Sequence, residues 1–270
     1  MSPPRVLIIA GSDSGGGAGI QADIKTVTML GGFAMTAVTA ITVQNTLGVS
    51  EVLPLPLEIV AAQIHAVLGD LGADAIKIGL LGTPELVRTV ADALPGGIPV
   101  VLDPVMVATS GDALNEAGTG EAMLELAGRA ALVTPNGPEL AALTGHRITN
   151  EQAMAAAASA LVSRFHGPVL AKGGHLPGEE IVDLLVGADG VVRRWAGSRI
   201  HTTSTHGTGC TLASAIATGL GAGMGMEAAI DRARDYVRAA IAAAPGFGGG
   251  HGPMGHALGA VPFELIHRKE

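Results

Sequence analysis

The chain has 270 residues, of which 48% are hydrophobic and only 15% charged, with a formal net charge of −8. No apolar run reaches the ~18 residues that a membrane span requires, and no basic block or aromatic–basic alternation is present that would bind nucleic acid. The single cysteine excludes an internal disulfide and a zinc site with paired cysteines, and no charged leader opens the chain, so we expect a cytoplasmic protein.

Strands and helices alternate along the chain. The first predicted strand, 5–10, is a run of apolar and β-branched residues that ends in the glycine-rich loop 11–17. The pattern then predicts, in chain order, a helix at 18–30, strands at 33–43 and 51–55, a helix at 57–71, a strand at 75–78, a helix at 83–94, a strand at 100–102, a helix at 118–126, a strand at 131–133, helices at 137–143 and 151–165, strands at 169–171, 181–186 and 191–195, and helices at 211–220 and 227–243.

This order of elements predicts an α/β fold. Short buried strands separated by helices are typical of a mostly parallel central sheet with helices on both faces. The strands 181–186 and 191–195, joined by a glycine-containing turn, indicate a small hairpin at one edge. No Pro/Ser-rich linker or charge run divides the chain, so we expect a single domain over residues 1–270.

Polar and glycine residues follow most of the predicted strands. Ligands of such sheets bind beyond the carboxyl ends of the strands, so these residues are candidates for a site. They are Gly11-Ser12-Asp13, Gln44-Asn45-Thr46, Lys77-Ile78-Gly79, Asp103-Pro104, Thr134-Pro135-Asn136 and Lys172-Gly173-Gly174-His175. Each group alone also suits a simple turn. Their regular placement at one edge of the sheet nevertheless predicts one binding site there.

The stretch Thr205-His206-Gly207-Thr208-Gly209-Cys210 precedes a helix of small residues. Glycines at 207 and 209 permit positive φ, so the backbone N–H groups can converge on one point, and a helix start binds phosphate. The positive end of the helix dipole would lower the pKa of Cys210 and favour its use as a base or an anion partner. A lone cysteine also serves as a small buried hydrophobe, and a Gly-Thr-Gly turn also serves only as a helix cap.

Eight segments between residues 10 and 253 together resemble the hydroxymethylpyrimidine/phosphomethylpyrimidine kinases of thiamin biosynthesis, which belong to the ribokinase superfamily. The segments are AGSDSGGGAGIQADIKT (10–26), TAITVQNT (39–46), IKIGLLG (76–82), LDPVMVATSG (102–111), TPNGPE (134–139), KGGH (172–175), THGTGCTLASAIA (205–217) and GHGP (250–253). Cys210 stands where sugar kinases of the superfamily carry an aspartate. The resemblance implies a ribokinase-like fold.

The resemblance also implies an activity. Such enzymes transfer the γ-phosphoryl group of ATP, with Mg²⁺, to the hydroxymethyl group of 4-amino-5-hydroxymethyl-2-methylpyrimidine, and then phosphorylate the monophosphate to the diphosphate. The turn of Gly207, Thr208 and Gly209 suits the negative charge that develops on the transferred group, and Cys210 takes the place of a base. The resemblance further implies a homodimer, for which the edge strand at 52–56 is a candidate surface.

The same similarity assigns roles to further residues. Gln44 would bind the pyrimidine, because its amide matches the amino group and ring nitrogen of the substrate. The same pocket would include Gly11, Asp23, Leu80 and Val107. Oxygen ligands for Mg²⁺ and its waters would come from the Asn-x-x-Glu pattern of Asn136 and Glu139, and from Asp103. The nucleotide would contact Lys172, Thr205, His206 and Asn136.

Simpler roles remain open for several of these residues. Gln44 also suits a surface position after a strand, Asp23 an exposed first-turn helix acid, Asn136 a helix cap, and Lys172 a solvated cation. The chain also departs from the family pattern. Leu80 stands where methionine is more usual, residues 201–204 include no acid before the turn, and no lysine precedes 250–253.

Other functions compete with this interpretation. A pyridoxal kinase is the nearest rival, since it shares the fold, Mg²⁺·ATP and a hydroxymethyl acceptor on an aromatic ring. A cysteine hydrolase with Cys210 as nucleophile and His206 as base is a rival of another class, as is a non-catalytic binding protein of the same fold. The pattern Gly17-x-Gly19-x-x-Ala22 lacks the later acid that a dinucleotide ribose needs, which argues against an NAD oxidoreductase.

Overall fold

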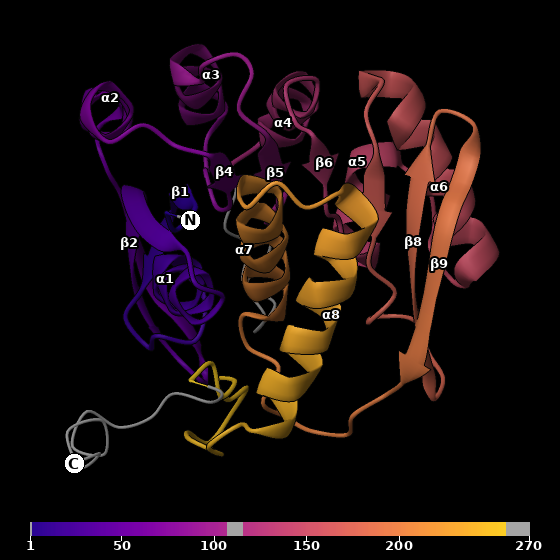
Figure 1. The fold of residues 1–270 in the computed structure, drawn as a ribbon. Coiled ribbons are helices and arrows are strands. Elements are labelled where there is room, and N and C mark those ends of the chain that lie inside the picture. Colours follow the sequence, from indigo (N-terminus) through magenta and orange to yellow (C-terminus); the bar gives the residue numbers. More distant parts are fainter. Residues whose placement is uncertain (1, 107–115, 258–270) are drawn as a thin grey trace.

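The computed structural model describes residues 2–106 and 116–257, and the strands of this part of the chain form one nine-stranded sheet (Figure 1). Its strand order is β3-β2-β1-β4-β5-β6-β7-β8-β9. The strands span Arg5–Asp13 (β1), Phe33–Asn45 (β2), Gly48–Pro54 (β3), Ala75–Ile78 (β4), Val100–Leu102 (β5), Leu132–Val133 (β6), Val169–Ala171 (β7), Glu180–Gly187 (β8) and Gly190–Ser198 (β9). Pairing is parallel from β2 to β7, and antiparallel for β3 at one edge and for β8 and β9 at the other. The predicted α/β fold with a hairpin edge is confirmed.

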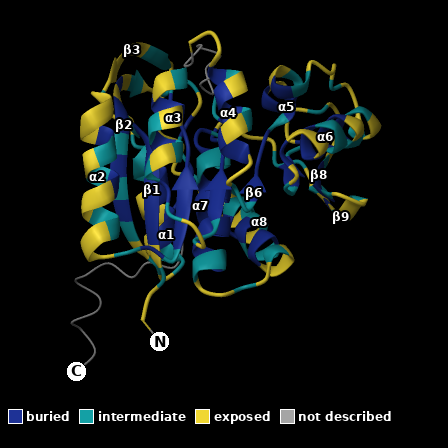
Figure 2. Cartoon of the chain, turned by 90° about the horizontal axis from the view of Figure 1, so that it is seen from above, coloured by how far each residue is buried: buried dark blue, intermediate teal, exposed yellow. Residues whose placement is uncertain are grey.

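Helices cover both faces of the sheet. They span Gly19–Met29 (α1), Leu57–Asp70 (α2), Pro84–Ala93 (α3), Thr119–Ala127 (α4), Gly137–Thr144 (α5), Glu151–Phe165 (α6), Thr208–Gly221 (α7) and Met226–Ala242 (α8). Helices α1, α7 and α8 pack together on one face, and α2 to α6 follow one another across the other (Figures 1 and 2). The central parallel strands are therefore buried between two helical layers.

The core is divided by the sheet into two layers, because successive side chains of a strand point to opposite faces. On β1, Leu7 and Ile9 join the cluster under α2 to α6, while Val6 and Ile8 join the cluster under α7 and α8. All four are fully buried, which explains why β1 reads as a continuous apolar run. Figure 2 shows this buried interior in dark blue.

Helix α7 begins earlier than the sequence pattern predicts. Its first residue is Thr208, whereas the periodicity predicts a start at residue 211. Gly207 is the N-cap, with a φ of 84°, a conformation that a glycine adopts without steric cost. Consequently, Thr208, Gly209 and Cys210 form the first helical turn. Strands β1 and β2 also extend beyond their predicted ends, to Asp13 and Asn45.

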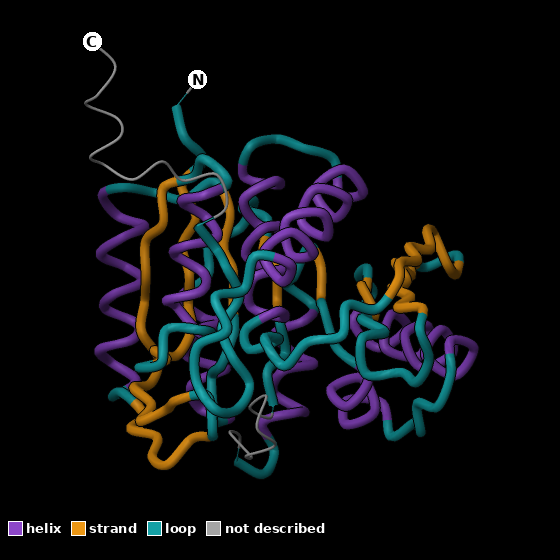
Figure 3. Tube along the Cα trace, turned by 90° about the horizontal axis from the view of Figure 1, so that it is seen from below, coloured by secondary structure: helices purple, strands orange, loops and turns teal. Residues whose placement is uncertain are grey.

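The carboxyl ends of the parallel strands meet at one side of the molecule, next to the β2–β3 turn, which lies at the upper edge of Figure 2 and the lower edge of Figure 3. The start of α7 reaches the same side, next to the 250–253 segment, because His206 pairs with Pro253 in an isolated bridge. Across the ranges that the structure describes, none of the helices combines the length and apolar character of a bilayer span.

Candidate active site

A cavity of about 1170 Å³ opens at the carboxyl ends of the strands. It brings together most of the site residues predicted from the sequence. Its lining includes Gly11, Gln44, Leu80, Asp103, Asn136, Glu139, Lys172, Thr205, His206, Gly207, Thr208, Gly209 and Cys210. Val107 lies outside the described residues, and Asp23 is not part of the lining. Segments from six strand ends and from the start of α7 therefore converge on one space.

The start of α7 forms one wall of this cavity. The first backbone N–H groups of a helix have no acceptor within the helix, so they are available to an anion. Gly207 packs directly against the backbone carbonyl of Gly17, in a space that a Cβ atom would fill. Thr205 precedes the turn, and its carbonyl accepts from the N–H of Thr208 at 3.3 Å. The close packing of Gly207 against Gly17 and the hydrogen bond between Thr205 and Thr208 thus fix the conformation of the turn.

A charged cluster lies beside this helix start. A Cβ on Gly209 would be 3.1 Å from Nζ of Lys172 and 3.3 Å from Oδ2 of Asp103. Nζ of Lys172 donates to Oδ1 of Asp103 at 2.8 Å and lies 3.9 Å from Oε2 of Glu139. Burial alone would lower the pKa of Lys172, but the two carboxylates raise it above its usual value. The lysine is therefore an ion-paired cation of the site and not the solvated side chain that the sequence left open.

Asn136 and Glu139 form a capping box at the start of α5. Oδ1 of Asn136 accepts from the N–H of Glu139 at 2.9 Å, and Oε2 of Glu139 accepts from the N–H of Asn136 at 2.8 Å. Burial raises the pKa of Glu139 to about 7, against the opposing effect of Lys172. Asn136 is thus a helix cap, as the alternative interpretation proposed, and still lines the cavity. One oxygen of Glu139, Oε1, has no role in the capping box.

The donor set fits Mg²⁺ bound together with phosphates. Within 2–106 and 116–257, there is no group of three or more His, Cys, Asp or Glu side chains that could hold a metal. Asp103 and Glu139 instead offer two carboxylates, both nearly buried, at the same wall of the cavity. Mg²⁺ is usually bound by one or two carboxylates, with waters and substrate phosphates completing its shell.

Asp23 is a correction to the sequence prediction. Its side chain is fully buried on α1 and is not part of the lining of the cavity. It is therefore also not the exposed helix acid of the alternative interpretation. Oδ2 of Asp23 accepts from Nζ of Lys77 at 2.8 Å, and Oδ1 accepts from Oγ of Ser214 at 2.7 Å. Lys77 does line the cavity, and although burial opposes its charge, Asp23 and other nearby acids raise its pKa. Asp23 therefore acts behind Lys77, as its counter-ion.

The predicted lowering of the Cys210 pKa is wrong. Burial raises the pKa of this thiol to about 11, because the loss of solvent outweighs the nearby Lys77 ammonium, and the carboxylates of Asp23 and Asp103 add to the rise. Cys210 is partly exposed in the first turn of α7, where the helix dipole acts, but the dipole effect is modest beside the loss of solvent around the sulfur. At neutral pH, Cys210 is a thiol and not an activated thiolate.

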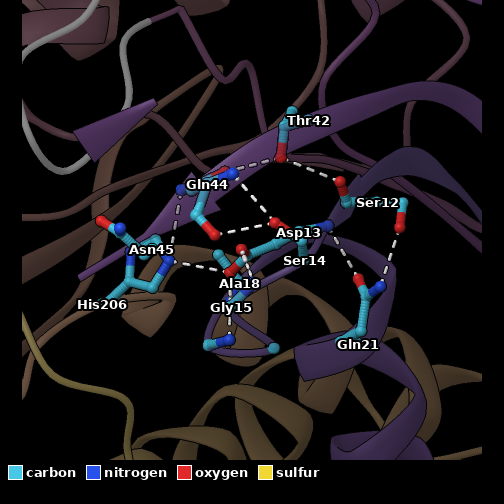
Figure 4. Close-up of polar contacts among 12 residues, drawn as sticks. Ser12, Asp13, Ser14, Gly15, Ala18, Gln21, Thr42, Gln44, Asn45 and His206 are labelled. Carbon is cyan, nitrogen blue, oxygen red and sulfur yellow. Dashed lines mark hydrogen bonds and ion pairs between the residues drawn. The ribbon is translucent and has the colours of Figure 1, made fainter. Parts of the chain in front are cut away.

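Gln44 lies near the end of β2, separated by β1 and β4 from the ends of β5 and β7, where Asp103 and Lys172 lie. Figure 4 shows it beside Thr42 and His206. Its amide is 3.0 Å from Oγ1 of Thr42 and 3.3 Å from Nε2 of His206. Nε2 of His206 is also 2.9 Å from Oδ2 of Asp13. His206 was predicted to contact the nucleotide, but its side chain faces Gln44, the residue predicted to bind the pyrimidine. Gln44 is half-buried and held in place, unlike a surface glutamine.

Sequence reasoning included Asp13 and Lys77 among the strand-end candidates but gave them no role, and it missed Thr42, which also lines the cavity. A signal for Lys77 was present, since a lysine within the apolar strand β4 must find an acid when it is buried. Asp13 also follows a strand and precedes a glycine-rich loop, where a carboxylate accepts from successive backbone N–H groups. Thr42 had no local signal, because its role depends on partners from β1 and on Gln44.

The family model described as phosphomethylpyrimidine kinase matches residues 13–255, nearly the whole described chain. The chain belongs to the phosphomethylpyrimidine kinase family. A hydroxymethylpyrimidine/phosphomethylpyrimidine kinase of Rhizobium meliloti is 49% identical over 255 residues, which cover 93% of this chain and 96% of the relative. The family assignment shows that this chain is a kinase.

Solved structures agree with the family. A phosphomethylpyrimidine kinase from Clostridium difficile superposes with a TM-score of 0.76 at 38% identity, covering 88% of this chain and 99% of that one. A pyridoxal kinase from Bacillus subtilis in complex with ADP superposes with a TM-score of 0.87 at 32% identity, covering 95% and 98%. The ribokinase-like fold predicted from the sequence is thus confirmed, and the family has structural neighbours that act on two different aromatic acceptors.

Proposed function

We propose that this protein phosphorylates 4-amino-5-hydroxymethyl-2-methylpyrimidine with ATP, and then its monophosphate to the diphosphate, in thiamin biosynthesis. The observation that carries the proposal is the position of the α7 start, with Lys172 and Asp103 beside Gly209 and with Gln44 across the same cavity. The start of α7 can bind a phosphoryl group, Lys172 can pair with its charge, and Gln44 can bind a heterocyclic alcohol in the same cavity. This arrangement suits transfer of a phosphoryl group from a nucleotide to that alcohol.

The residues divide the chemistry between them. In the first step the substrate hydroxyl oxygen forms a bond to the γ-phosphorus, the bond from that phosphorus to the bridging oxygen breaks, and ADP leaves while the hydroxyl loses its proton. The amides of Thr208, Gly209 and Cys210 would stabilise charge on the transferred group, and Lys172 would pair with phosphate oxygens. Such a transition state is loose and depends mainly on positioning and electrostatics.

Cys210 would meet the hydroxyl as a neutral thiol at physiological pH, since burial raises its pKa to about 11. It therefore serves as a hydrogen-bonding neighbour of the transferred group, and as a proton acceptor only to the extent that its thiolate forms. Lys77 is ion-paired with Asp23 and adds positive charge to the lining of the cavity that also contains Cys210. Asp103 and Glu139 would hold Mg²⁺, which neutralises phosphate charge when bound, and Asn136 would position its waters.

Pyridoxal phosphorylation is the second candidate activity. The observation that favours it is the fold similarity to pyridoxal kinases at 32% identity. Phosphate transfer from ATP should be measured for both acceptors under the same conditions, with the purified protein and Mg²⁺. Higher kcat/KM for the aminopyrimidine supports the proposed function. A preference for pyridoxal, or ATP hydrolysis that neither acceptor stimulates, would contradict it.

The geometry does not favour the cysteine hydrolase. Such an enzyme needs a thiolate activated by its histidine, whereas burial raises the pKa of Cys210. Nε2 of His206 is within hydrogen-bond distance of Asp13, on the Gln44 side of the cavity. Esterase or peptidase turnover without ATP would be needed to revive this alternative.

We also propose a homodimer in the cytoplasm, formed through β3. This strand is one edge of the described sheet, and it carries exposed apolar side chains together with neighbouring β2. Leu53 on β3 is 57% exposed and Val43 on β2 is 54% exposed. An apolar, unpaired edge is a liability for a monomer and is commonly covered by another chain.

A further inference from the structure

The side chain of Asp13 is enclosed by hydrogen-bond donors (Figure 4). Oδ1 accepts from the N–H of Gly15 at 2.8 Å, and Oδ2 accepts from the N–H groups of Gly17 at 3.0 Å and Ala18 at 2.8 Å. Nε2 of His206 is 2.9 Å from the same Oδ2. Burial alone would raise the pKa of Asp13, but these donors hold it below its usual value. An ionised oxygen that already faces two donors can only accept, so Nε2 of His206 carries a hydrogen.

This hydrogen decides which end of the Gln44 amide faces His206. The Gln44 amide atom placed 3.3 Å from Nε2 of His206 is the nitrogen. If the hydrogen on Nε2 goes to Asp13, Nε2 has no lone pair left to accept from an amide N–H, so the nitrogen does not suit this position and the amide oxygen does. The amide oxygen therefore belongs beside His206. Exchanging the oxygen and nitrogen of an amide leaves the shape of the side chain unchanged, so the hydrogen-bond partners fix the choice.

Thr42 gives the same answer independently. Its hydroxyl has one hydrogen but is 3.0 Å from two acceptors, the carbonyl oxygen of Ser12 and the amide atom placed as Oε1 of Gln44. The carbonyl can only accept, so it takes the hydroxyl hydrogen, and the amide atom beside Thr42 must then donate. This places the amide nitrogen at Thr42. Two residues from different elements thus require one orientation of Gln44.

We propose that Asp13, His206 and Thr42 are positioning residues that lock the Gln44 amide with its oxygen beside His206 and its nitrogen beside Thr42. The amide then offers one lone pair and one N–H to the cavity in a fixed order. It selects an aromatic ring in which an amino N–H adjoins a ring-nitrogen acceptor, and it rejects the oxo analogue, in which a carbonyl acceptor adjoins a ring N–H donor. This inference rests on the proposed function, in which Gln44 contacts the pyrimidine ring.

The test measures equilibrium binding without ATP, by titration calorimetry with two pyrimidines. One is the 4-amino-5-hydroxymethyl-2-methyl compound, and the other is its 4-oxo analogue. For the wild type we expect the amino compound to bind at least about 30-fold more tightly, because two hydrogen bonds are mismatched in the analogue. His206→Leu and Thr42→Val should each reduce this ratio to less than about fivefold, mainly by tighter binding of the oxo analogue, because the freed amide can rotate.

Two further variants separate positioning from general damage to the pocket. His206→Gln places an amide N–H near the position of Nε2 and should restore most of the wild-type ratio. Gln21→Leu is the matched control, because Gln21 contacts the backbone N–H of Asp13 and Oγ of Ser12 but not Gln44. Its ratio should equal that of the wild type. Thermal unfolding of each variant identifies any loss of fold, and Thr42→Val, which conserves shape, keeps the test valid if His206→Leu unfolds.

Three outcomes would overturn the inference. They are a wild type that binds both compounds equally, an unchanged ratio in both folded locking variants, and a ratio that Gln21→Leu lowers as much as His206→Leu does. In each case phosphorylation of the amino compound by the wild type would show that the proposed function stands without the lock. A wild type that neither binds nor phosphorylates the amino compound would remove the proposed function and this inference together.

Discussion

Nζ of Lys172, which follows β7, donates to Oδ1 of Asp103, which follows β5, at 2.8 Å, and β6 lies between these two strands in the sheet. The same ammonium is 3.9 Å from Oε2 of Glu139, so one cation balances both carboxylates that the sequence predicts as magnesium ligands. A divalent cation at these carboxylates would compete with Lys172 for their charge. We therefore expect Lys172 to turn toward the phosphates when the metal and nucleotide bind together.

The first prediction concerns this metal. We expect strict dependence of turnover on Mg²⁺, and a loss of ~10²-fold or more in kcat for Glu139→Ala, because the phosphoryl group carries charge that must be neutralised. Steady-state kinetics with and without EDTA measure the first effect. Glu85→Ala, an exposed first-turn glutamate of α3, is the control and should retain wild-type kcat. Full turnover in EDTA would contradict the prediction.

The second prediction is a pH dependence of metal binding. Burial raises the pKa of Glu139 to about 7, so a proton must leave this carboxyl before it can bind Mg²⁺ at lower pH. The apparent affinity for Mg²⁺ should therefore be constant above pH ~7.5 and should weaken up to tenfold per pH unit below pH ~6.5. Titrations with Mn²⁺ as a spectroscopic probe of the same site would measure it. Glu139→Gln should bind weakly at every pH, without this slope.

The sequence predicted the parts of the site that depend on local chain geometry. The turn Gly207–Cys210 was found because glycines and a following helix are neighbours in the chain. The capping role of Asn136 followed from the same kind of local spacing. Strand ends were also sufficient to place Asp103 and Lys172 at one edge, since parallel strands align their carboxyl ends.

The rest of the site depends on partners that are distant in sequence. Asp23 was placed wrongly because its position on α1 does not reveal that Lys77, 54 residues away, lies against it. The pKa of Cys210 was predicted in the wrong direction because burial, which is a property of the assembled fold, outweighs the helix dipole. The partners of Gln44 also come from two separate segments, β2 and the turn before α7.

The third prediction concerns Gln44. Gln44→Leu keeps the size of the side chain but leaves the polar edge of the pyrimidine against an apolar group, which costs roughly 1 to 3 kcal/mol of binding. The KM for the pyrimidine should rise by about 5- to 150-fold. The KM for ATP should change little, because the acceptor and nucleotide occupy different parts of the cavity. An equal rise in both constants would indicate damage to the fold and not to recognition.

The fourth prediction concerns assembly through β3. Light scattering should give a mass of about twice the 26.9 kDa of the chain at micromolar concentration. Leu53→Lys places a charge on the exposed face of this edge strand, so it should shift the protein toward the monomer. Val192→Lys, at an exposed position on β9 at the other edge of the sheet, is the control and should leave the dimer intact. A wild type that is monomeric at micromolar concentration would refute this arrangement.

The last prediction concerns Cys210. Its pKa of about 11 means that iodoacetamide labelling should be slow at pH 7 and should accelerate tenfold per unit as the pH rises toward that value. If the thiolate of Cys210 accepts the hydroxyl proton, Cys210→Ala should lower kcat by ~10² to 10⁴ with nearly unchanged ATP affinity, and Cys210→Asp should retain more activity than the alanine variant. If the thiolate is the base, kcat of the wild type should also rise with pH over the same range. If Cys210→Ala instead keeps the wild-type kcat, the amides of the α7 start suffice for a loose transition state, and the cysteine serves only packing.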